Sequence, residues 1–310
     1  MPQGIYLPEG YGKTPATPEA LERAMRAGTR TEGIATLCDE GRNLYVRMGR
    51  ERGVIPRSET GLGAEEGRLR DIAILSRVGK PVAFLVTGRK DGLWQLSRRA
   101  LQAQAQRFLL EQLQPGEIIR ARVTHLEQFG AFVDMGCGLV SMIGVENVSV
   151  SRIRTTAQRF HVGQDIYAAV LRCDARSGRV WLTHRELLGT WEQNAALLQP
   201  GAALRGIVRG VEPYGVFIEL TPNLSGLAET GRALEQGMDA TVLIKSIQKD
   251  RMKIKLSVLE AAPGSGVRWI TPEDYYLKEG LLRRWQYQPA CCSSRCIETD
   301  FQLTGQFSRE

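Results

Sequence analysis

The chain is 310 residues long, with a hydrophobic content of 43%, a charged content of 24% and a formal net charge of +7. The length predicts about two domains or three small ones, and the composition is ordinary for a globular protein, so disorder is not the default expectation. The positive charge favours nucleic acid or an anionic membrane surface as partner, and the share of Arg, 33 of 41 basic residues, favours nucleic acid.

Membrane insertion and secretion are not expected from this sequence. No run of about 18 apolar residues is present, and the N-terminal sequence MPQGIYLPEG lacks a basic segment followed by an apolar one. Six cysteines are too sparse for a disulfide framework in a chain of this length. We therefore expect a cytoplasmic protein without a membrane partner.

The first expected element is a short helix in an N-terminal extension, residues 1–30. Thr17, Pro18 and Glu19 have the pattern of an N-cap, a first-turn proline and a first-turn acid, and Gly28 can end the helix. Residues 31–98 follow as a first unit of short strands. A helical linker is expected over residues 99–114, where apolar residues recur at helical spacing before Pro115 and Gly116.

Two further units repeat one pattern. LQPGEIIRARVTHLEQFGAFVDMG and LQPGAALRGIVRGVEPYGVFIEL begin at Leu113 and Leu198, 85 positions apart, and align without a gap. They open units at residues 115–186 and 200–260, with a helical linker at 187–199 and a tail at 261–310. Five short strands with Gly-centred turns in roughly 65–75 residues predict a small closed antiparallel barrel.

Each of these two units carries an aromatic-Gly-x-aromatic motif. Phe129 and Phe132 occupy it in the second unit, and Tyr214 and Phe217 in the third. In the first unit only Tyr45 matches, since Arg42 takes the position of the first aromatic. The first unit is thus expected to fold alike and to bind differently.

With Val162-Gly163-Gln164 and the stretch from Asp174 to Arg179, the repeated motif resembles the S1 RNA-binding domain, an OB-fold barrel. The segments YLPEG, RDIAILSRVGKPVAF, ELLGTWEQNA and WQYQP…IETDF are also similar to short, three-repeat bacterial homologues of ribosomal protein S1. The resemblance implies a mainly β chain of three tandem five-stranded OB-fold barrels with helical linkers. It also implies binding of single-stranded RNA or mRNA and association with the small ribosomal subunit.

The resemblance places the RNA-binding face residue by residue. In the second unit the matching positions are the two phenylalanines with Asp174 and Arg179, and Gly144 replaces the histidine of the family. In the third unit they are Tyr214 and Phe217, with Glu229 at the histidine position and Gln248 and Lys253 in place of the acidic and basic pair. The Glu229 carboxylate repels phosphate, so the third unit is expected to bind RNA more weakly or to read a base edge.

Strand alternation leaves several side chains with two interpretations. Phe132 is expected to face outward as a stacking platform, whereas Phe129 shares the parity of buried positions and is as readily half-buried as stacking. Trp181 is expected outward, either stacking on a base or covering a linker helix, and Trp191 is interpreted as a packing anchor. Arg120 and Arg122 lie on the outer face of the first strand, as phosphate contacts or as a solvated basic surface.

The remaining motifs predict no cofactor and no catalysis. Cys291, Cys292 and Cys296 lack the spacing and the fourth ligand of a zinc site, and they are expected as free thiols in a strand-turn-strand tail. No phosphate-binding Gly-rich loop and no catalytic spacing of His, Asp or Glu is present.

The expected function is therefore sequence-tolerant RNA binding in translation, with the second unit as principal reader. One alternative is a protein-docking scaffold associated with the ribosome, with incidental RNA affinity. The other is a nuclease or redox enzyme that uses the tail thiols.

Overall fold

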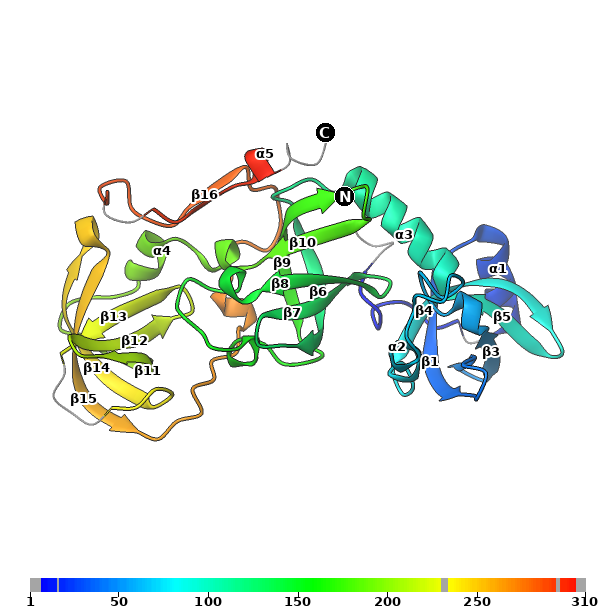
Figure 1. Ribbon diagram of the computed structural model, residues 1–310, viewed down its shortest axis with the longest axis horizontal. Coiled ribbons are helices and arrows are strands. Elements are labelled where there is room, and N and C mark those ends of the chain that lie inside the picture. The colour runs from blue at the N-terminus through cyan, green and yellow to red at the C-terminus, as the bar shows by residue number, and fades with distance from the viewer. Residues whose placement is uncertain (1–6, 16, 230–233, 294–295, 305–310) are drawn as a thin grey trace. The chain divides into compact units, whose positions relative to one another are not determined.

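The protein consists of three closed five-stranded barrels followed by a small C-terminal sheet (Figure 1). The computed structural model describes residues 7–15, 17–229, 234–293 and 296–304. The expectation of a mainly β chain of three OB-fold barrels is confirmed, because each barrel has the strand order 1-2-3-5-4 and closes between its first and fourth strands.

The barrels differ from the expected antiparallel pattern at one strand pair each. The third and fifth strands of every barrel are paired in parallel. A closed ring with an odd number of strands cannot alternate direction at every neighbour, so one parallel pair is a geometric necessity of the five-stranded closure.

The chain divides into two compact units. The first comprises residues 1–113 with 134–140, and the second comprises residues 114–133 with 141–310. The strands of the first barrel are β1 (Thr31–Cys38), β2 (Leu44–Met48), β3 (Glu51–Ile55), β4 (Pro81–Lys90) and β5 (Leu93–Ser97). Its helical elements are α1 (Pro18–Ala27), η1 (Arg57–Glu59), α2 (Asp71–Leu75) and α3 (Arg98–Gln112).

The N-terminal helix begins and ends where the sequence indicates. The Thr17 side chain accepts a hydrogen bond from the Ala20 N–H, Pro18 opens the helix, and Gly28 ends it in the left-handed conformation with φ 57°. The preceding segment is fixed by Glu9, a residue of the YLPEG motif whose Tyr6 lies outside the described residues. The buried Glu9 carboxylate accepts a hydrogen bond from Arg98 Nε at 2.7 Å and one from the Ala83 N–H at 3.1 Å.

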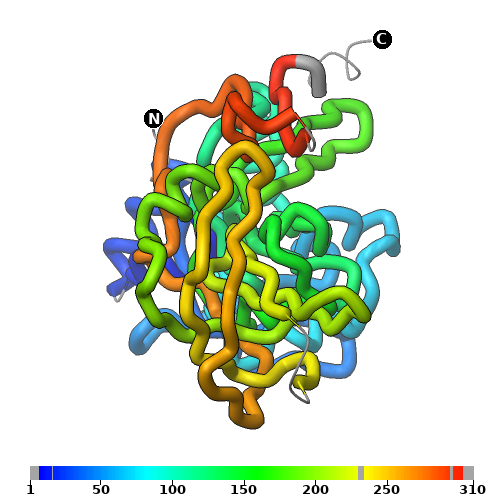
Figure 2. Tube along the Cα trace, turned by 90° about the vertical axis from the view of Figure 1, so that its left-hand side faces the viewer, coloured from blue at the N-terminus to red at the C-terminus, as the bar shows by residue number. Residues whose placement is uncertain are grey.

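The third barrel and most of the second lie in the second unit, and residues 134–140 of β7 and β8 are counted with the first. The second barrel contains β6 (Ile118–Leu126), β7 (Gly130–Gly136), β8 (Leu139–Gly144), β9 (Asp165–Asp174) and β10 (Arg179–Thr183), with η2 (Val145–Asn147) and η3 (Thr156–Gln158). The third contains β11 (Ala203–Glu212), β12 (Gly215–Thr221), β13 (Leu224–Ala228), β14 (Asp239–Gln248) and β15 (Lys253–Ala262), with η5 (Lys249–Arg251). Figure 2 shows the long β14–β15 hairpin of the third barrel in yellow and orange.

The linker between these barrels contains two short helical pieces, and not the longer helix expected over residues 187–199. It consists of η4 (Arg185–Leu188) and α4 (Trp191–Ala195), separated at Gly189. Gly189 has φ 81°, which is outside the helical range and interrupts the helix, and a Cβ at this position would lie 2.5 Å from the Tyr276 ring, so only glycine fits.

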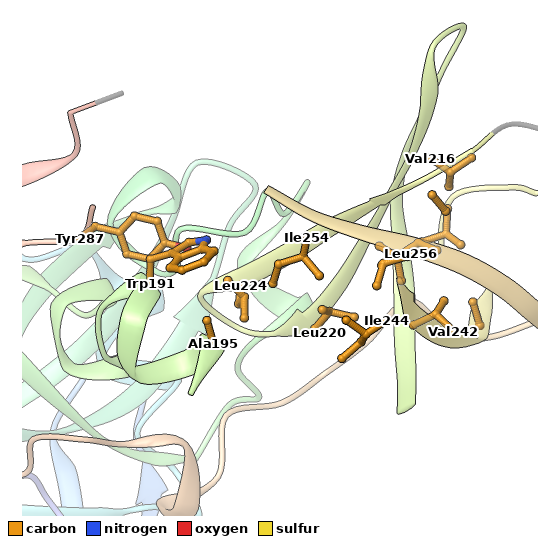
Figure 3. Packing of buried hydrophobic residues seen from close by; sticks show 14 of the residues in the cluster. Trp191, Ala195, Val216, Leu220, Leu224, Val242, Ile244, Ile254, Leu256 and Tyr287 are labelled. Carbon is orange, nitrogen blue, oxygen red and sulfur yellow. The ribbon is translucent and has the colours of Figure 1, made fainter. Parts of the chain in front are cut away.

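A shared hydrophobic cluster joins the second barrel, the linker, the third barrel and the C-terminal segment. Figure 3 shows the part of this cluster at the linker and the third barrel. Trp191 from α4 and Tyr287 from the C-terminal segment are both buried in it, beside the core of the third barrel. Trp191 is therefore a packing anchor, as predicted. Burial of these two large aromatic rings attaches the linker to the third barrel and to the C-terminal segment.

The C-terminal segment closes the second unit with η6 (Pro272–Asp274), β16 (Arg284–Gln286), β17 (Glu298–Asp300) and α5 (Phe301–Thr304). β16 and β17 pair antiparallel, as the predicted strand-turn-strand tail requires, and Cys291, Cys292 and Cys296 form no disulfide. The buried Glu186 carboxylate accepts hydrogen bonds from Thr183 of β10 and Thr299 of β17. This contact attaches the tail to the second barrel.

A buried charged cluster links the second barrel to the third. Glu219 Oε2 lies 2.5 Å from Nη2 of Arg159, which follows η3, and 2.6 Å from Nε of Arg209 in β11. The side chains of Arg159 and Glu219 are fully buried, and that of Arg209 is 3% exposed. Burial lowers the pKa of Arg159 to about 10, so it stays charged at neutral pH.

The segment after β15 is hydrogen-bonded to the same cluster. The Gly266 carbonyl accepts hydrogen bonds from Arg209 Nη1 and Gln158 Nε2, and the Ile270 N–H donates to the Arg159 carbonyl. Arg268 Nη1 donates to the Leu220 carbonyl. The two barrels are thus connected by side chains and a third chain segment, and not by the linker alone.

The substitution Glu219→Gln is expected to destabilise the second unit by about 3–5 kcal/mol, because it leaves two buried guanidinium groups without a carboxylate. Denaturant unfolding followed by circular dichroism and tryptophan fluorescence measures this loss. Glu229→Gln, at an exposed position in the same barrel, is the matched control. A Glu219→Gln variant as stable as the control would contradict the structural role of the cluster.

His184 is the one buried histidine among the described residues. Its Nδ1 lies 2.8 Å from the Val148 carbonyl and its Nε2 lies 2.9 Å from the Tyr275 hydroxyl. Burial lowers the pKa of His184 to about 4, and the charge of Arg159 lowers it further while the Val148 carbonyl opposes the shift. The neutral ring therefore donates to Val148 and accepts from Tyr275.

Acid is expected to destabilise the second unit through His184. Because the folded pKa lies below the unfolded value of about 6.5, this contribution is complete above pH 6.5 and is lost as the pH falls towards 4, by about 3 kcal/mol in all. Comparing denaturant unfolding of the native chain and His184→Gln at pH 7.5 and pH 4.5 isolates this effect. An equal loss of stability in both proteins would show that His184 is not its source.

The comparison between the two proteins is needed because Asp134, in the first unit, acts in the opposite direction. Burial, with the charge of Glu9, raises the pKa of Asp134 to about 6. Its contribution therefore favours the folded state as the pH falls from 6 towards 4.

Candidate nucleic-acid interface

The second barrel presents a pair of aromatic rings on its outer surface. Phe129 is 58% exposed, Phe132 is half-buried, and their ring centroids lie 6.1 Å apart at an interplanar angle of 89°. Phe129 lies in the turn before β7 and not in the strand, so strand parity does not apply to it and the half-buried interpretation is wrong.

The third barrel repeats this arrangement with different residues. Tyr214 is 70% exposed and Phe217 is 37% exposed, and their centroids lie 6.2 Å apart at 87°. The same edge-to-face geometry has thus arisen on two barrels from Phe-Phe and from Tyr-Phe. The planes of the two rings in an edge-to-face pair point in different directions, which suits the stacking of unpaired bases.

The glycine between the aromatics is required by the neighbouring strand. A Cβ on Gly130 would lie 2.9 Å from the Ile143 carbonyl oxygen of β8. A Cβ on Gly215 would lie 2.9 Å from the Ala228 carbonyl oxygen of β13. In both barrels the motif therefore brings the aromatic pair close against the third strand.

His125 is a neighbour of the aromatic pair that the sequence did not single out. Its ring centroid lies 6.1 Å from that of Phe132, and its Nε2 lies 2.8 Å from Glu127 Oε1. Val123 is buried and Thr124 is half-buried, while both His125 and Leu126 are at least partly exposed, so the alternation of β6 ends here. Alternation would have placed His125 on the buried face, which is why it was missed.

The two arginines of β6 have different surroundings. Arg120 is exposed, and its guanidinium lies 5.7 Å from the centroid of the Tyr167 ring. Arg122 forms a two-point ion pair with Asp165, with Nε 2.6 Å from Oδ1 and Nη2 3.1 Å from Oδ2. Arg120 is therefore the more available of the two for a phosphate.

Asp174 and Arg179 lie opposite each other where β9 and β10 begin to pair. The Asp174 carboxylate accepts hydrogen bonds from the N–H groups of Arg176 and Ser177 and, at 2.6 Å, from the Ser177 hydroxyl. These hydrogen bonds lower the pKa of Asp174, and the hydrogen bond from the Ser177 hydroxyl has the largest effect. Asp174 thus shapes the hairpin turn, while Arg179 is exposed.

In the third barrel the equivalent pair is Gln248 and Lys253, which are also register partners. Lys253 is exposed. The third barrel has a further carboxylate at Glu229, which lies 3.5 Å from the Lys245 ammonium. Gln248 and Lys253 thus replace Asp174 and Arg179 of the second barrel, and the hairpin is kept.

Trp181 lies on the outer surface of the second barrel, as expected from its parity, and is half-buried. It pairs with Met142 of β8 and Arg172 of β9, and the Arg172 guanidinium lies 3.8 Å from the centroid of its ring. The ring is therefore covered on one side by a cation. Arg172 was missed because only the β9–β10 register shows that it lies opposite Trp181.

The first barrel lacks an equivalent aromatic pair. Tyr45 is half-buried, and its hydroxyl lies 3.3 Å from Asp39 Oδ2. Arg42, at the first aromatic position, has its Nε 2.8 Å from Asp71 Oδ2. Polar contacts within the first barrel thus engage the positions that carry the paired aromatic rings in the other two.

The described residues contain no group of three or more His, Cys, Asp or Glu side chains arranged to hold a metal ion. No helix in the described part of the chain is long and apolar enough to span a membrane.

One protein-family model matches the segment that forms the second barrel. The S1 RNA binding domain model matches residues 112–185. The predicted resemblance to S1-domain proteins is confirmed. The matched segment contains Phe129, Phe132, Asp174 and Arg179, whereas the positions assigned in the third unit lie outside it.

The chain is also similar to small ribosomal subunit proteins of bacteria. It is 28% identical over 200 residues to the small ribosomal subunit protein bS1 homolog of Bacillus subtilis (strain 168), covering 59% of this chain and 52% of that protein. It is 23% identical over 257 residues to the small ribosomal subunit protein bS1 of Rhizobium meliloti (strain 1021), covering 77% and 44%. The chain spans about half the length of these relatives, or less.

Replacing Asp174 separates a role in the turn from a role in RNA contact. Asp174→Asn keeps a hydrogen-bond acceptor for the turn and is expected to bind a single-stranded RNA at least as tightly as the native chain, because a negative charge near phosphate is removed. Asp174→Ala is expected to lower the melting temperature more than Asp174→Asn.

Fluorescence anisotropy and thermal melting measure the two quantities. A loss of RNA affinity in the folded Asp174→Asn variant would show that the carboxylate itself contacts the RNA.

Proposed function

We propose that the chain binds single-stranded RNA through its second and third barrels and acts in translation beside the small ribosomal subunit. The observation that carries the proposal is the aromatic pair repeated on two barrels with the same edge-to-face geometry. The S1 match to the second barrel and the ribosomal names of the relatives support it.

Stacking and charge would together supply the binding free energy. Each base stacked on an aromatic ring contributes about 1–3 kcal/mol with little dependence on sequence. Arg120, Arg179 and Lys253 are exposed cations of the second and third barrels and would contact phosphates, with Arg122 as a weaker contributor because of its ion pair with Asp165. Trp181 with Arg172 would extend the face of the second barrel.

Connection of the two barrels strengthens weak individual sites. Once a strand is bound to one barrel, the second barrel meets it at a high effective concentration, provided that the geometry allows both contacts. The buried cluster of Arg159, Arg209 and Glu219 holds the two barrels in one body. Two modest sites would therefore act as one site of useful affinity for mRNA.

A docking role is proposed for the first barrel alone. Its aromatic positions are engaged in internal polar contacts, whereas Ile34 and Leu37 of β1 are 37% and 55% exposed. An exposed apolar strand suits a protein contact better than a phosphate backbone. The proposal for the whole chain is binding, without a catalytic step.

The double variant Phe132→Ala/Phe217→Ala is expected to bind single-stranded RNA at least about tenfold more weakly, since it removes one stacking ring from each barrel. The measurement is a fluorescence-anisotropy titration with an unstructured RNA and with a matched duplex at two salt concentrations. Leu197→Ala, which removes an exposed apolar side chain from the linker, is the control.

The native chain should prefer the single strand and retain part of that preference at high salt. Unchanged affinity in the folded double variant would contradict the assigned face. Equal binding to single strand and duplex that salt abolishes would reduce the proposal to a general basic surface.

A further inference from the structure

A groove joins the second barrel to the aromatic face of the third. Its volume is about 750 Å³, which lies within the range of small-ligand sites. One wall is the loop Val150–Arg154 of the second barrel, and the other carries Tyr214 and Phe217 of the third. Trp191 and Tyr287 also line it. We call it the inter-barrel groove.

The loop of the second barrel is held firmly against the third barrel. The Val150 N–H donates to Asn223 Oδ1 at 2.9 Å, and the Ser151 N–H donates to the Pro222 carbonyl at 3.2 Å. The hydroxyls of Ser151 and Ser225 lie 2.9 Å apart. These contacts fix the start of the loop, so the residues that follow are presented at a defined place on the rim.

Two free cations follow these anchored residues. Arg152 and Arg154 are exposed and line the groove, and neither side chain forms a hydrogen bond or ion pair with any residue that the structure describes. Free, exposed arginines on a fixed loop next to aromatic rings have the form of a phosphate-binding rim.

The interior of the groove is also positive. Arg209 lines it, and this residue shares the single carboxylate of Glu219 with Arg159, so the buried cluster carries one excess positive charge. The Nη2 atom of Arg209 is buried and has no hydrogen-bond partner among the described residues. Glu212 is the one acidic side chain among the described lining residues, against three arginines.

We propose that the inter-barrel groove is a composite site for single-stranded RNA, in which bases stack on Tyr214 and Phe217 while the adjoining phosphates contact Arg152 and Arg154. This inference rests on the proposed function and specifies it further. The third barrel then binds RNA with cations supplied by the loop of the second barrel, which offsets its own Glu229 and its loss of the acidic and basic pair.

The shape and chemistry of the groove select a single strand. Bases of a duplex are paired and stacked inside the helix, so their faces cannot reach Tyr214 and Phe217, whereas the bases of a single strand can be splayed onto them. Two arginines on the rim and two rings on the wall match the alternation of phosphates and bases along one strand.

Charge removal on the rim tests the composite site. Arg152→Ala/Arg154→Ala is expected to weaken binding of an unstructured RNA about tenfold and to lower the slope of log affinity against log salt by about 1.4, the value for two phosphates of a single strand. Arg23→Ala/Arg26→Ala, on exposed positions of α1, removes the same charge from the first unit and is the control.

The decisive measurement is the coupling between the arginines of the rim and Tyr214 of the wall in their effects on RNA affinity. In a double-mutant cycle with Tyr214→Ala, the loss caused by Tyr214→Ala should be smaller in the Arg152→Ala/Arg154→Ala background than in the native chain, because one strand contacts both. Additive losses would overturn the composite site. Circular dichroism and melting verify that each variant is folded.

The experiment separates this inference from the proposed function. If the rim variant binds like its control while Phe132→Ala/Phe217→Ala loses affinity, the composite groove is wrong and the proposed function stands. If the rim variant weakens single-stranded and duplex RNA alike, the rim is a general basic surface and the groove is again wrong. If neither the rim variant nor the aromatic variant loses affinity, both proposals are wrong.

Discussion

The buried carboxylate of Glu219 determines the organisation of the second unit. A charge fully removed from water is tolerated only when partners of opposite charge compensate it, and here one partner comes from each barrel. Neither Arg159 nor Arg209 finds another carboxylate within hydrogen-bonding distance among the described residues. Arg209 pairs with Glu219 within the third barrel, whereas the Arg159–Glu219 ion pair forms only when the two barrels are together.

The proposed binding of RNA by the aromatic faces depends on this connection. A single OB-fold barrel with two stacking rings binds RNA only weakly, because the entropy cost of ordering a flexible strand offsets much of the stacking free energy. Two such faces in one body can engage one strand without the entropy of searching for a second molecule. The linker contributes through burial of Trp191 more than through helix length, since Gly189 divides it into two short helical pieces.

Local features of the sequence predicted much of the fold. The repeat spacing of 85 positions, the caps at Thr17 and Gly28 and the alternation in the strands are short-range patterns, and each has a direct structural counterpart. The aromatic pairs were also visible, because their motif is four residues long. Phe129 was ambiguous, because alternation was applied beyond the end of the strand.

Contacts between distant positions could not be read in this way. Arg159 and Glu219 are 60 positions apart, and nothing in either neighbourhood indicates the other. The same is true of the loop Val150–Arg154, whose place beside Tyr214 depends on contacts with Pro222 and Asn223. Pairing of Arg122 with Asp165 likewise arises from the register of β6 and β9, which alternation alone does not fix.

The central claim is that one RNA strand contacts the second and third barrels together. Ultraviolet crosslinking of a short unstructured RNA to the full chain, followed by mass spectrometry of the crosslinked peptides, tests it most directly. The account predicts crosslinks at Phe129 and Phe132, at the loop Val150–Arg154, and at Tyr214 and Phe217, with single RNA molecules joined to peptides from both barrels. Crosslinks confined to the first unit, or spread evenly over the basic surface, would contradict it.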